Sequence, residues 1–571
     1  MEEQSLLSQA IELHQQGAFS QADGLYDILL QNNNEHPEIL YLSSSTSWIL
    51  GRPEAAYARL KKALHLQKDD RFFALMGNVC QSLGKYEESV THYLLALNHG
   101  NTEADTHTNM GVALHELQRY KDSEQAHQAA LAIEENHLGA RYNLARVYLE
   151  QKDHSQAQKH FLIALEESPN DVDILNNLGN TYLHQEQILL ARQQYAKALG
   201  VDQHCAEALY NMAMSYQKTG DSQAAKHRLQ ALLGIHPKHF PAMIALADIC
   251  IFEHDYYTAE QLLGMATQLQ PHHHLAWSSF ADVLMQQDQY SAAIVAIEKT
   301  LSLKETAKSW IQLAVVQREM RNKKQLDITN DDIAESFRRA LELEPNNGKA
   351  QYLLDMIEGT TPTRAPSDYV ENLFDFYAPK FEEHLVDILE YQTPRCLKEL
   401  LFSEQEQTQF ESILDIGCGT GLMGELLYAH TDQLIGVDIS NKMLSIAKDK
   451  NCYQALLTAD IFQFLADSIQ AFDLIVASDV LVYIGDLQPI FASVCRRLTE
   501  NGYFLFSVEE LFSDEGICLN PEARFQHSLS HIQQSLPQDL SIHSTRRMPL
   551  RKNSDVWVEG LLVLAQKHTQ R

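Results

Sequence analysis

The first two thirds of the chain repeat one pattern of small and bulky apolar positions. Gly179 and Tyr195 hold two of these positions in one copy, and Ala213 and Leu229 hold them 34 residues later. A small residue at a helix crossing lets a second helix approach closely, while the bulky residue fills the groove between hairpins. The period therefore predicts about ten helical hairpins over residues 3–346. The amphipathic segment that follows them is expected to cap the stack, because a terminal repeat has no neighbour to cover its apolar face.

A different pattern begins near Glu411, where short apolar runs alternate with helical segments. The runs read ESILDIG, QLIGVD, YQALLTAD, AFDLIVAS and GYFLFSVEE. Such alternation predicts parallel strands joined by crossover helices, as in a doubly wound α/β sheet. Residues 359–366 lie in GTTPTRAPS, whose helix-breaking composition suits a linker or hinge. We therefore expect a multidomain chain, with an all-α repeat array in residues 1–358 and an α/β domain in residues 367–571.

Composition narrows the classes of function. The chain has 571 residues, of which 45% are hydrophobic and 21% charged, so it is long and apolar enough to fold into more than one domain. Its formal net charge of -31 opposes binding to a phosphate backbone, and we expect no nucleic-acid partner. An acidic surface favours basic proteins or peptides as partners, although it can equally serve solubility alone.

The sequence also bears on the compartment. None of the eight cysteines belongs to a Cys-x-x-Cys pair, so we predict neither a metal site nor a disulfide framework. The N-terminal segment is acidic and amphipathic, unlike a secretory signal, and no apolar run approaches the ~20 residues that span a bilayer. The expectation is a cytoplasmic protein that does not engage a membrane.

Candidate chemistry gathers where the first two predicted strands end. Asp415 opens a glycine loop with Gly417, Gly419 and Gly421, and Asp438 ends the second strand. A dinucleotide-binding loop cradles a pyrophosphate, whereas an aspartate here would repel phosphate and suit the ammonium of a methionine moiety. Glycines let the backbone approach a ligand, and the carboxylate of the second strand is placed to accept hydrogen bonds from both ribose hydroxyls.

These motifs resemble class I S-adenosylmethionine-dependent methyltransferases over about residues 367–571. The resemblance implies a Rossmann-like domain with S-adenosyl-L-methionine as its cofactor. It also implies that Asp460 faces the adenine amino group, that the backbone of Ile461 meets the ring, and that Ser478 lies beside the cofactor at the end of the fourth strand. The alternative is that the glycines form only tight turns and that the strand-end aspartates cap the following helices.

The segment before the sheet resembles the N-terminal cap of bacterial repeat-bearing methyltransferases, which lies over the cofactor. It reads YVENLFDFYAPKFEEHLVDILEYQTP. The resemblance makes Tyr377, Phe381 and His384 candidates to line the pocket. An amphipathic packing helix would show the same aromatic spacing, and this is the alternative.

Candidate catalytic residues follow the fourth and fifth strands. The element Arg524-Phe-Gln-His527-Ser is similar to one in the same group of enzymes, near the entrance for substrate. Methyl transfer needs alignment and sometimes a base, so His527 is a candidate base, with Asp479 or Tyr483 orienting the acceptor. A surface histidine is the alternative for His527. The Asn-Pro-Pro-Tyr signature of many amino methyltransferases is missing at Ser478, which argues against DNA bases and glutamine amides as acceptors.

The repeats resemble the tetratricopeptide family. Asn109, Asn143, Asn177 and Asn211 occupy the same position of four successive copies, on the side expected to face the concave groove. An asparagine amide carries a donor and an acceptor, so such a ladder can hold an extended peptide by its backbone. The repeat domain of the O-linked N-acetylglucosamine transferases holds peptides with a comparable ladder, which implies a peptide-binding groove here. The alternative is that asparagine is common at this position throughout the family.

These features together predict a methyltransferase that acts on a protein or peptide recruited by the repeats. One alternative is a small-molecule methyltransferase whose repeats serve assembly. Another is a scaffold whose cofactor domain has lost its chemistry. The sequence leaves the acceptor atom and the oligomeric state open.

Overall fold

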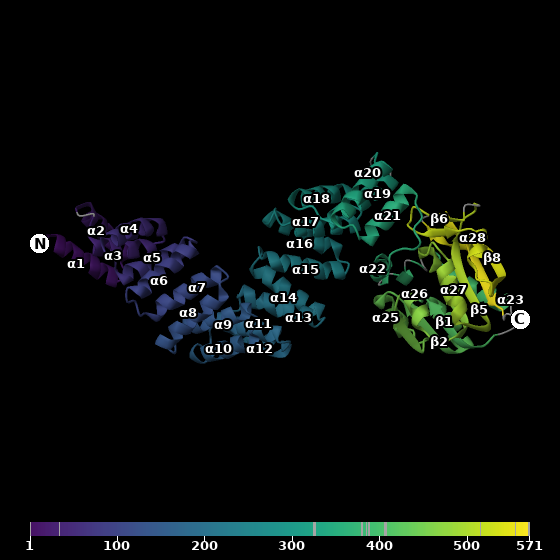
Figure 1. The fold of residues 1–571 in the computed structure, drawn as a ribbon, viewed down its shortest axis with the longest axis horizontal. Coiled ribbons are helices and arrows are strands. Elements are labelled where there is room, and N and C mark those ends of the chain that lie inside the picture. The colour runs from purple at the N-terminus through teal and green to yellow at the C-terminus, as the bar shows by residue number, and fades with distance from the viewer. Residues whose placement is uncertain are drawn as a thin grey trace. The chain divides into compact units, whose positions relative to one another are not determined.

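The computed structural model describes residues 2–32, 35–323, 327–378, 381–383, 385, 389–404, 408–513, 516–553 and 556–568. The chain divides into two compact units, Met1–Gln270 and Pro271–Arg571, which are described separately (Figure 1). None of the helices in these described parts combines the length and the apolar character that crossing a membrane would require.

The first unit is all helical, and its helices pack in consecutive pairs. They are α1 (Glu2–Gln15), α2 (Phe19–Asn32), α3 (Pro37–Ile49), α4 (Pro53–Leu66), α5 (Asp70–Ser82), α6 (Tyr86–Asn98), α7 (Ala104–Glu116), α8 (Tyr120–Ile133), α9 (Leu138–Glu150), α10 (His154–Glu167), α11 (Val172–His184), α12 (Ile188–Val201), α13 (Ala206–Lys218), α14 (Ser222–Ile235), α15 (Phe240–Phe252) and α16 (Tyr256–Leu269).

Close contact between a small and a bulky residue joins the two helices of a hairpin. A Cβ added at Gly179 would lie 2.4 Å from the ring of Tyr195, and one at Gly77 would lie 2.4 Å from the ring of Tyr93. Both tyrosine side chains are fully buried. Only a residue without a side chain leaves room for these rings, so the repeating pattern of small and bulky positions is explained by packing.

The second unit begins with further helices of the same kind. These are α17 (His274–Gln286), α18 (Tyr290–Leu303), α19 (Ala307–Asn322), α20 (Asn330–Leu343) and α21 (Gly348–Glu358). Within the described residues, α1 to α20 pair in sequence order as hairpins and α21 follows them as a single helix, which confirms the predicted repeat architecture.

A mixed α/β domain completes the second unit. Its helices are α22 (Ser367–Tyr377), α23 (Thr393–Glu404), α24 (Leu422–Leu427), η3 (Tyr428–His430), α25 (Asn441–Asp449), α26 (Ile461–Asp467), η4 (Leu481–Tyr483), α27 (Gln488–Arg497) and α28 (Leu529–Ser535). Its strands are β1 (Phe410–Ile416), β2 (Thr431–Asp438), β3 (Ala455–Thr458), β4 (Phe472–Ala477), β5 (Leu498–Glu510), β6 (Ile517–Leu519), β7 (Phe525–His527), β8 (Leu540–Asn553) and β9 (Val556–Lys567).

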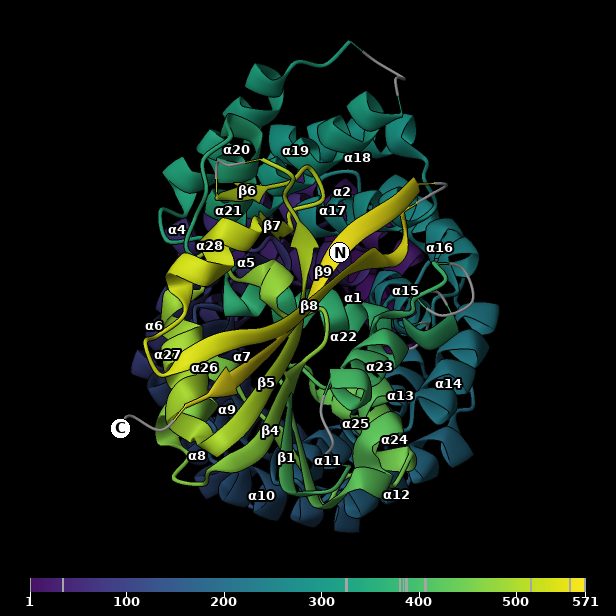
Figure 2. The same cartoon turned by 90° about the vertical axis from the view of Figure 1, so that its right-hand side faces the viewer.

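The sheet confirms the predicted doubly wound topology. Strands run in the order β3-β2-β1-β4-β5-β7-β6, and β1 is parallel to both β2 and β4. Strand β9 pairs antiparallel with β5 and with β8. Figure 2 shows α26 and α27 on one side of the sheet and α23, α24 and α25 on the other. Separate apolar clusters lie under the two helical layers, so the strands are buried on both faces, as their continuous apolar runs require.

The segment expected to be a linker is docked on the α/β domain. The carbonyl oxygen of Thr363 accepts hydrogen bonds from the backbone of Gly485 and of Asp486, both at 2.8 Å, and the backbone N–H of Ala365 donates to the carbonyl of Tyr483 at 2.9 Å. These bonds fix residues 363–365 against the loop after β4. This helix-breaking segment therefore provides an extended strap on the α/β domain at residues 363–365.

The last repeats and the α/β domain share an apolar core. Tyr352 of α21 is 2% exposed, and its hydroxyl donates to the carbonyl oxygen of Ala523 at 2.7 Å. Phe525 of β7 is fully buried and belongs to the same cluster as Phe337 and Leu353 of the helices. The predicted domain boundary, residues 359–366, accordingly lies inside the second compact unit.

Candidate functional site

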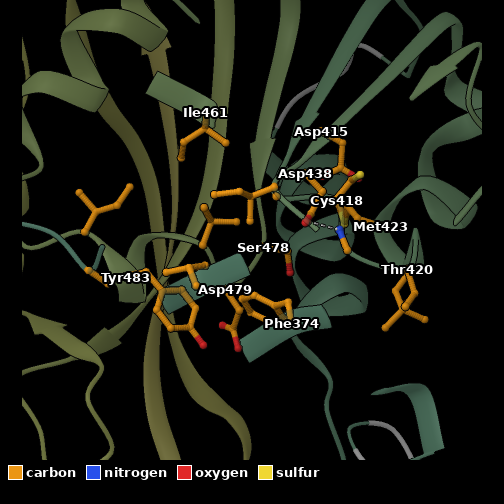
Figure 3. A pocket seen from close by; sticks show the side chains of 18 of the residues that line it. Phe374, Asp415, Cys418, Thr420, Met423, Asp438, Ile461, Ser478, Asp479 and Tyr483 are labelled. Carbon is orange, nitrogen blue, oxygen red and sulfur yellow. Dashed lines mark hydrogen bonds between the residues drawn. The ribbon is translucent and has the colours of Figure 1, made fainter. Parts of the chain in front are cut away.

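A cavity opens at the carboxyl ends of β1, β2 and β4 (Figure 3). The glycine loop after β1 and the loop after β4 line it, and α22 and residues 364–365 border it. Ligands in open α/β sheets bind at this edge, where the strand order reverses on either side of β1. Most sequence-predicted site residues meet here: Asp415, Gly417, Gly419, Asp438, Asp460, Ile461, Ser478, Asp479 and Tyr483 all line the cavity.

The two carboxylate oxygens of Asp415 differ in their hydrogen bonding. Tyr453 donates its hydroxyl proton to Oδ2 at 2.6 Å, while Oδ1 is buried without a hydrogen-bond partner among the described residues. Burial raises the pKa of this carboxyl to about 7, although the bond from Tyr453 opposes the shift. A buried carboxylate oxygen without a partner is costly, and a cationic ligand group in the cavity would satisfy it.

The glycine loop brings the backbone to the cavity. Gly419 has φ +54 and open space where a Cβ would be, and its N–H donates to Asp438 Oδ2 at 2.9 Å. Gly417, with φ +66, leaves no such space, because a Cβ there would lie 2.4 Å from Val480. Both positions need a left-handed backbone that glycine adopts without strain. The loop therefore leaves room for a ligand beside Gly419 and packs against the loop after β4 at Gly417.

The carboxylate of Asp438 is held in one orientation. Oδ2 accepts from Gly419 and Oδ1 accepts from the backbone N–H of Ser440 at 2.8 Å. The side chain is 7% exposed, and burial raises its pKa while the backbone hydrogen bonds lower it. Each carboxylate oxygen has a second lone pair, so the oriented group can also accept from two adjacent hydroxyls of a ligand.

Asp460 caps a helix while lining the cavity. Its Oδ1 accepts from the backbone N–H of Phe462 at 2.9 Å, and its Oδ2 accepts from the hydroxyl of Ser367 at 2.7 Å. Arg364 lies 3.3 Å from the same Oδ2. The alternative of a helix cap is thus realised at Asp460, and Ile461 follows it at the first position of α26.

Asp479 lies on the loop after β4 in a left-handed conformation, with φ 56. Its Oδ2 is 3.1 Å from Arg551 and 3.5 Å from Arg524, and its Oδ1 accepts from Ser507 at 3.3 Å. A non-glycine residue with positive φ is strained, and these contacts hold it in place. Asp479 is therefore an ion-paired carboxylate within a buried network.

Three residues that line the cavity were not predicted from the sequence to have a role there. Arg524 lies 5.4 Å from the ring centroid of Tyr483, Phe374 makes an edge contact with that ring at 5.5 Å, and the hydroxyl of Tyr391 lies 2.9 Å from that of Ser478. Arg524 stood in a recognised element without a function, and Phe374 lies four residues after Val370 on the cavity face of α22. Tyr391 lies in the segment that resembles the cap, but the sequence gave it no role of its own.

Two predicted residues lie outside the cavity lining in the described structure. Tyr377, the last residue of α22, is 41% exposed and outside the cavity lining, where Phe374 lies one turn earlier. Gly421 precedes α24 with φ +87 and is absent from the lining; a Cβ there would meet Tyr453 at 3.1 Å. Phe381 does line the cavity, whereas His384 is outside the described residues.

His527 is fully buried, contrary to its predicted role as a base at the cavity. Its Nε2 lies 3.4 Å from the carbonyl oxygen of Leu481, and its ring stacks on that of His531 at 5.3 Å. Burial, and then His531, lower its pKa to about 4. The described residues that line the cavity do not include it. His527 supports η4 from behind, which a sequence pattern alone could not reveal.

The four asparagines of the repeats bond mainly to neighbouring repeats. Asn109 donates to Asn78 at 3.1 Å, Asn177 donates to Tyr142 at 3.0 Å and Asn211 donates to Asn176 at 3.0 Å. The Oδ1 of Asn143 lies 3.5 Å from Arg146 of its own helix. All four are half-buried, on the first helices of successive hairpins, α7, α9, α11 and α13. They form a regular polar row within the first unit.

Among its described residues, the first unit contains a group of three residue types that can bind metals. The sequence predicts no metal site in the chain. Cys80, Glu88 and His92 have ligand atoms within 4.8 Å of one another. The Glu88 carboxylate accepts from the hydroxyl of Tyr57 at 2.5 Å and lies 3.6 Å from the ammonium of Lys85. Since its charge is already matched by these neighbours, we assign no metal to the group.

Comparison with known protein families agrees with this architecture. A methyltransferase domain family matches residues 414–506, and tetratricopeptide repeat families match residues 114–173, 160–193 and 207–239. The chain therefore carries tetratricopeptide repeats followed by a methyltransferase domain. The matched methyltransferase segment contains the glycine loop, Asp438, Asp460 and Ser478.

Curated relatives match the methyltransferase part. A ubiquinone biosynthesis O-methyltransferase of Coxiella burnetii is 30% identical over 112 residues, which are 19% of this chain and 48% of that protein. A malonyl-[acyl-carrier protein] O-methyltransferase of Hamiltonella defensa is 34% identical over 95 residues, 17% of this chain and 36% of that protein. The chain thus spans about half or less of the length of these relatives.

Solved structures resemble each part separately. The repeat protein YrrB, described as having an unusual peptide-binding site, aligns with a TM-score of 0.29 and 23% identity over 32% of this chain and 95% of YrrB. The N-methyltransferase NodS from Bradyrhizobium japonicum, in complex with S-adenosyl-L-homocysteine, aligns with a TM-score of 0.26 and 20% identity over 30% of this chain and 86% of NodS.

Proposed function

We propose that the chain is an S-adenosylmethionine-dependent methyltransferase that acts on a protein or peptide recruited by its repeats. The observation that carries the first half is the unpartnered buried oxygen of Asp415, beside a glycine loop and an oriented Asp438. The matched methyltransferase domain and two relatives named as O-methyltransferases support it. The same proposal places the chain in a reducing cytoplasm, where its free cysteines remain thiols.

Each cavity residue has a role toward the cofactor in this proposal. Asp415 binds the ammonium of the methionine part, and Gly419 leaves room for its backbone contact. Asp438 accepts hydrogen bonds from the two ribose hydroxyls. Asp460 and Ile461 face the adenine, and Ser478 borders the methionine part. When bound, the sulfonium supplies an electrophilic methyl group, so the protein contributes chiefly alignment and exclusion of water.

The cavity wall excludes water through apolar side chains. Val370 and Phe374 of α22 form one part of this wall, and Val480 and Ile484 of the loop after β4 form another. The strap at residues 363–365 ties α22 to that loop, so the two parts are held together. A substrate that enters between them meets a preformed apolar site, in which electrostatic interactions are stronger than in water.

The repeats recruit the acceptor in this proposal. The hydrogen bonds donated by the side-chain amides of Asn109 and Asn211 each use one of the two N–H groups that an asparagine carries. Further polar groups are left for the backbone of a peptide. Such amides recur at the same position of four successive hairpins, which provides the repeated polar contacts that an extended peptide backbone requires. The net charge of -31 additionally favours a basic partner.

A labelling experiment tests the proposal. The full-length chain is incubated with methyl-tritiated S-adenosylmethionine and a lysate of its source organism, and label is then measured in protein and small-molecule fractions. We expect label on protein, lost in Asp438→Ala and reduced at least about threefold in the double variant Asn143→Ala with Asn177→Ala. Label in the small-molecule fraction alone would make the repeats an assembly module. Cofactor binding without label in any fraction would indicate a scaffold.

A further inference from the structure

The cavity has a second end, which the roles given to the cofactor-binding residues leave unused. Tyr391, Asp479, Tyr483 and Arg524 line this part, which we call the acceptor end. Figure 3 shows Asp479, Tyr483 and Phe374 grouped together, away from Asp415 and Asp438. Ser478, at the end of β4, lies between the two groups and contacts Tyr391. The chemistry of the acceptor end should therefore reflect the group that receives the methyl.

The side chains at the acceptor end that could take up a proton are already ion-paired or protonated. Asp479 is shared by Arg551, Arg524 and Ser507. The two tyrosines keep their protons, since burial raises the pKa of Tyr391 and of Tyr483. Among the described residues that line this end, none is a histidine. An acceptor that must lose a proton during transfer would find no available base here.

Arg524 is the cation of the acceptor end. Its Nε lies 2.9 Å from Glu509 Oε1 but lacks the alignment of a hydrogen bond, and its second contact, to Asp479, is long at 3.5 Å. Arg551 by contrast bonds Glu509 at 2.6 Å and Asp479 at 3.1 Å. The two carboxylates are thus satisfied chiefly by Arg551. Arg524 keeps guanidinium donors for a planar anionic group, which such a fork binds in a bidentate manner.

We propose that the methyl acceptor is a carboxylate of the recruited protein or peptide, positioned by Arg524, and that the product is a methyl ester. This inference rests on the proposed function and names its substrate class. A carboxylate is ionised at neutral pH, so it needs no base, which agrees with the engaged proton acceptors of this end. Side-chain and chain-terminal carboxylates present the same two oxygens, so the site accepts either source.

The transfer balances without a proton acceptor. A carboxylate oxygen attacks the methyl carbon, the C–O bond forms as the C–S bond breaks, and the electron pair of that bond remains on sulfur. The products are the methyl ester and S-adenosylhomocysteine. The two positive charges of Arg524 and Arg551 balance the two negative charges of Asp479 and Glu509. The negative charge of the incoming carboxylate is therefore balanced by the positive charge of the sulfonium with which it reacts.

Alkali distinguishes this product from all methylated nitrogens. Full-length chain, methyl-tritiated S-adenosylmethionine and lysate are incubated as above, and both fractions are treated with dilute base. A methyl ester releases volatile tritiated methanol, whereas a methylamine or a methyl ether does not. Lysate whose carboxylates were first amidated with carbodiimide and glycinamide should lose labelling, and lysate whose amines were first dimethylated should keep it. Mass spectrometry of the labelled peptides then separates side-chain from terminal esters.

Alkali-stable label would contradict a carboxylate as the methyl acceptor, while the proposed methyltransferase function would stand. Label in the small-molecule fraction alone would contradict recruitment of a protein, and its stability to alkali would still decide between a carboxylate and another acceptor. Absence of label from both fractions would contradict both proposals.

The role of Arg524 is tested by Arg524→Gln, with Arg547→Gln as the matched control. Arg547 pairs with Glu510 outside the cavity lining and is 64% exposed. We expect Arg524→Gln to lower kcat/KM for the lysate acceptor at least about 50-fold while S-adenosylmethionine binding, measured by equilibrium dialysis, stays within about threefold. Equal losses of cofactor binding and transfer would assign Arg524 to the cofactor instead, and unchanged transfer would remove it from the site.

Discussion

Among single residues, Asp415 should have the clearest effect on cofactor binding. Because its pKa is raised to about 7 by burial, the carboxylate is partly protonated near neutrality and would pair less well with a cation. We expect S-adenosylmethionine to bind more weakly at pH 6 than at pH 8. Asp415→Asn should bind at least about tenfold more weakly at pH 8 and lose most of the difference between the two pH values. Equilibrium dialysis of both proteins at each pH measures this, and parallel pH profiles would contradict it.

The same carboxylate has a predictable effect on stability. The pKa of Asp415 is about 7 in the folded chain and lies above its ordinary value of 3.8. Its contribution to the free energy of unfolding is therefore fully present below the pKa of the unfolded chain, and it is lost as pH rises through the pKa of the folded chain. The loss is about 1.4 kcal/mol for each pH unit between the two values. Asp415→Asn without cofactor should therefore gain more in melting temperature at pH 8 than at pH 5. A larger gain at pH 5 would argue against a buried, unpartnered carboxylate.

The residues that sequence reasoning found share one property. Asp415, Asp438 and Ser478 end strands, and the carboxyl ends of neighbouring parallel strands necessarily meet at one edge of a sheet. Arg524 and Tyr391 come from loops before β7 and before α23, and their place depends on contacts across the fold. The side chain of His527 on strand β7 lies against η4, a position that spacing along the chain does not determine.

At the scale of elements, the hairpins depend on glycine where two helices cross. Gly179→Ala would place a Cβ 2.4 Å from the fully buried ring of Tyr195, so we expect a loss of about 1–3 kcal/mol in the free energy of unfolding of the repeats. Gly200→Ala, in α12, meets nothing within 4 Å and should be neutral or stabilising by up to about 1 kcal/mol. Urea titration followed by circular dichroism measures both changes. Equal effects of the two substitutions would contradict the packing explanation.

A hydrogen bond connects α21 to the loop that carries Arg524. Tyr352→Phe removes the donor to the carbonyl oxygen of Ala523, which is buried, and should cost about 1–3 kcal/mol. Because Ala523 has φ 59 and directly precedes Arg524, we also expect a higher KM for the acceptor. Tyr26→Phe is the matched control, since the buried Tyr26 hydroxyl has no hydrogen-bond partner among the described residues. If the control were the more destabilising variant, this contact would not anchor the loop.

At the scale of the whole molecule, the α/β domain should not be independent of the last repeats. Composition reveals the helix breakers at residues 359–366, but it does not reveal the hydrogen bonds that residues 363–365 make to the loop after β4. We expect residues 271–571 to unfold as one cooperative unit. A fragment of residues 360–571 would expose Leu519 and Phe525 of the shared core and should melt at a lower temperature. Differential scanning calorimetry of the two fragments decides, and equal melting temperatures would contradict a shared core.

The cavity at the ends of β1, β2 and β4 should bind S-adenosylmethionine, which can be measured without knowledge of the methyl acceptor. Equilibrium dialysis of the full-length chain at pH 8 against tritiated S-adenosylmethionine should give saturable binding of one molecule per chain. In Asp438→Ala the affinity should fall at least about tenfold. Wild-type chain without saturable binding, or Asp438→Ala with unchanged affinity, would contradict the account.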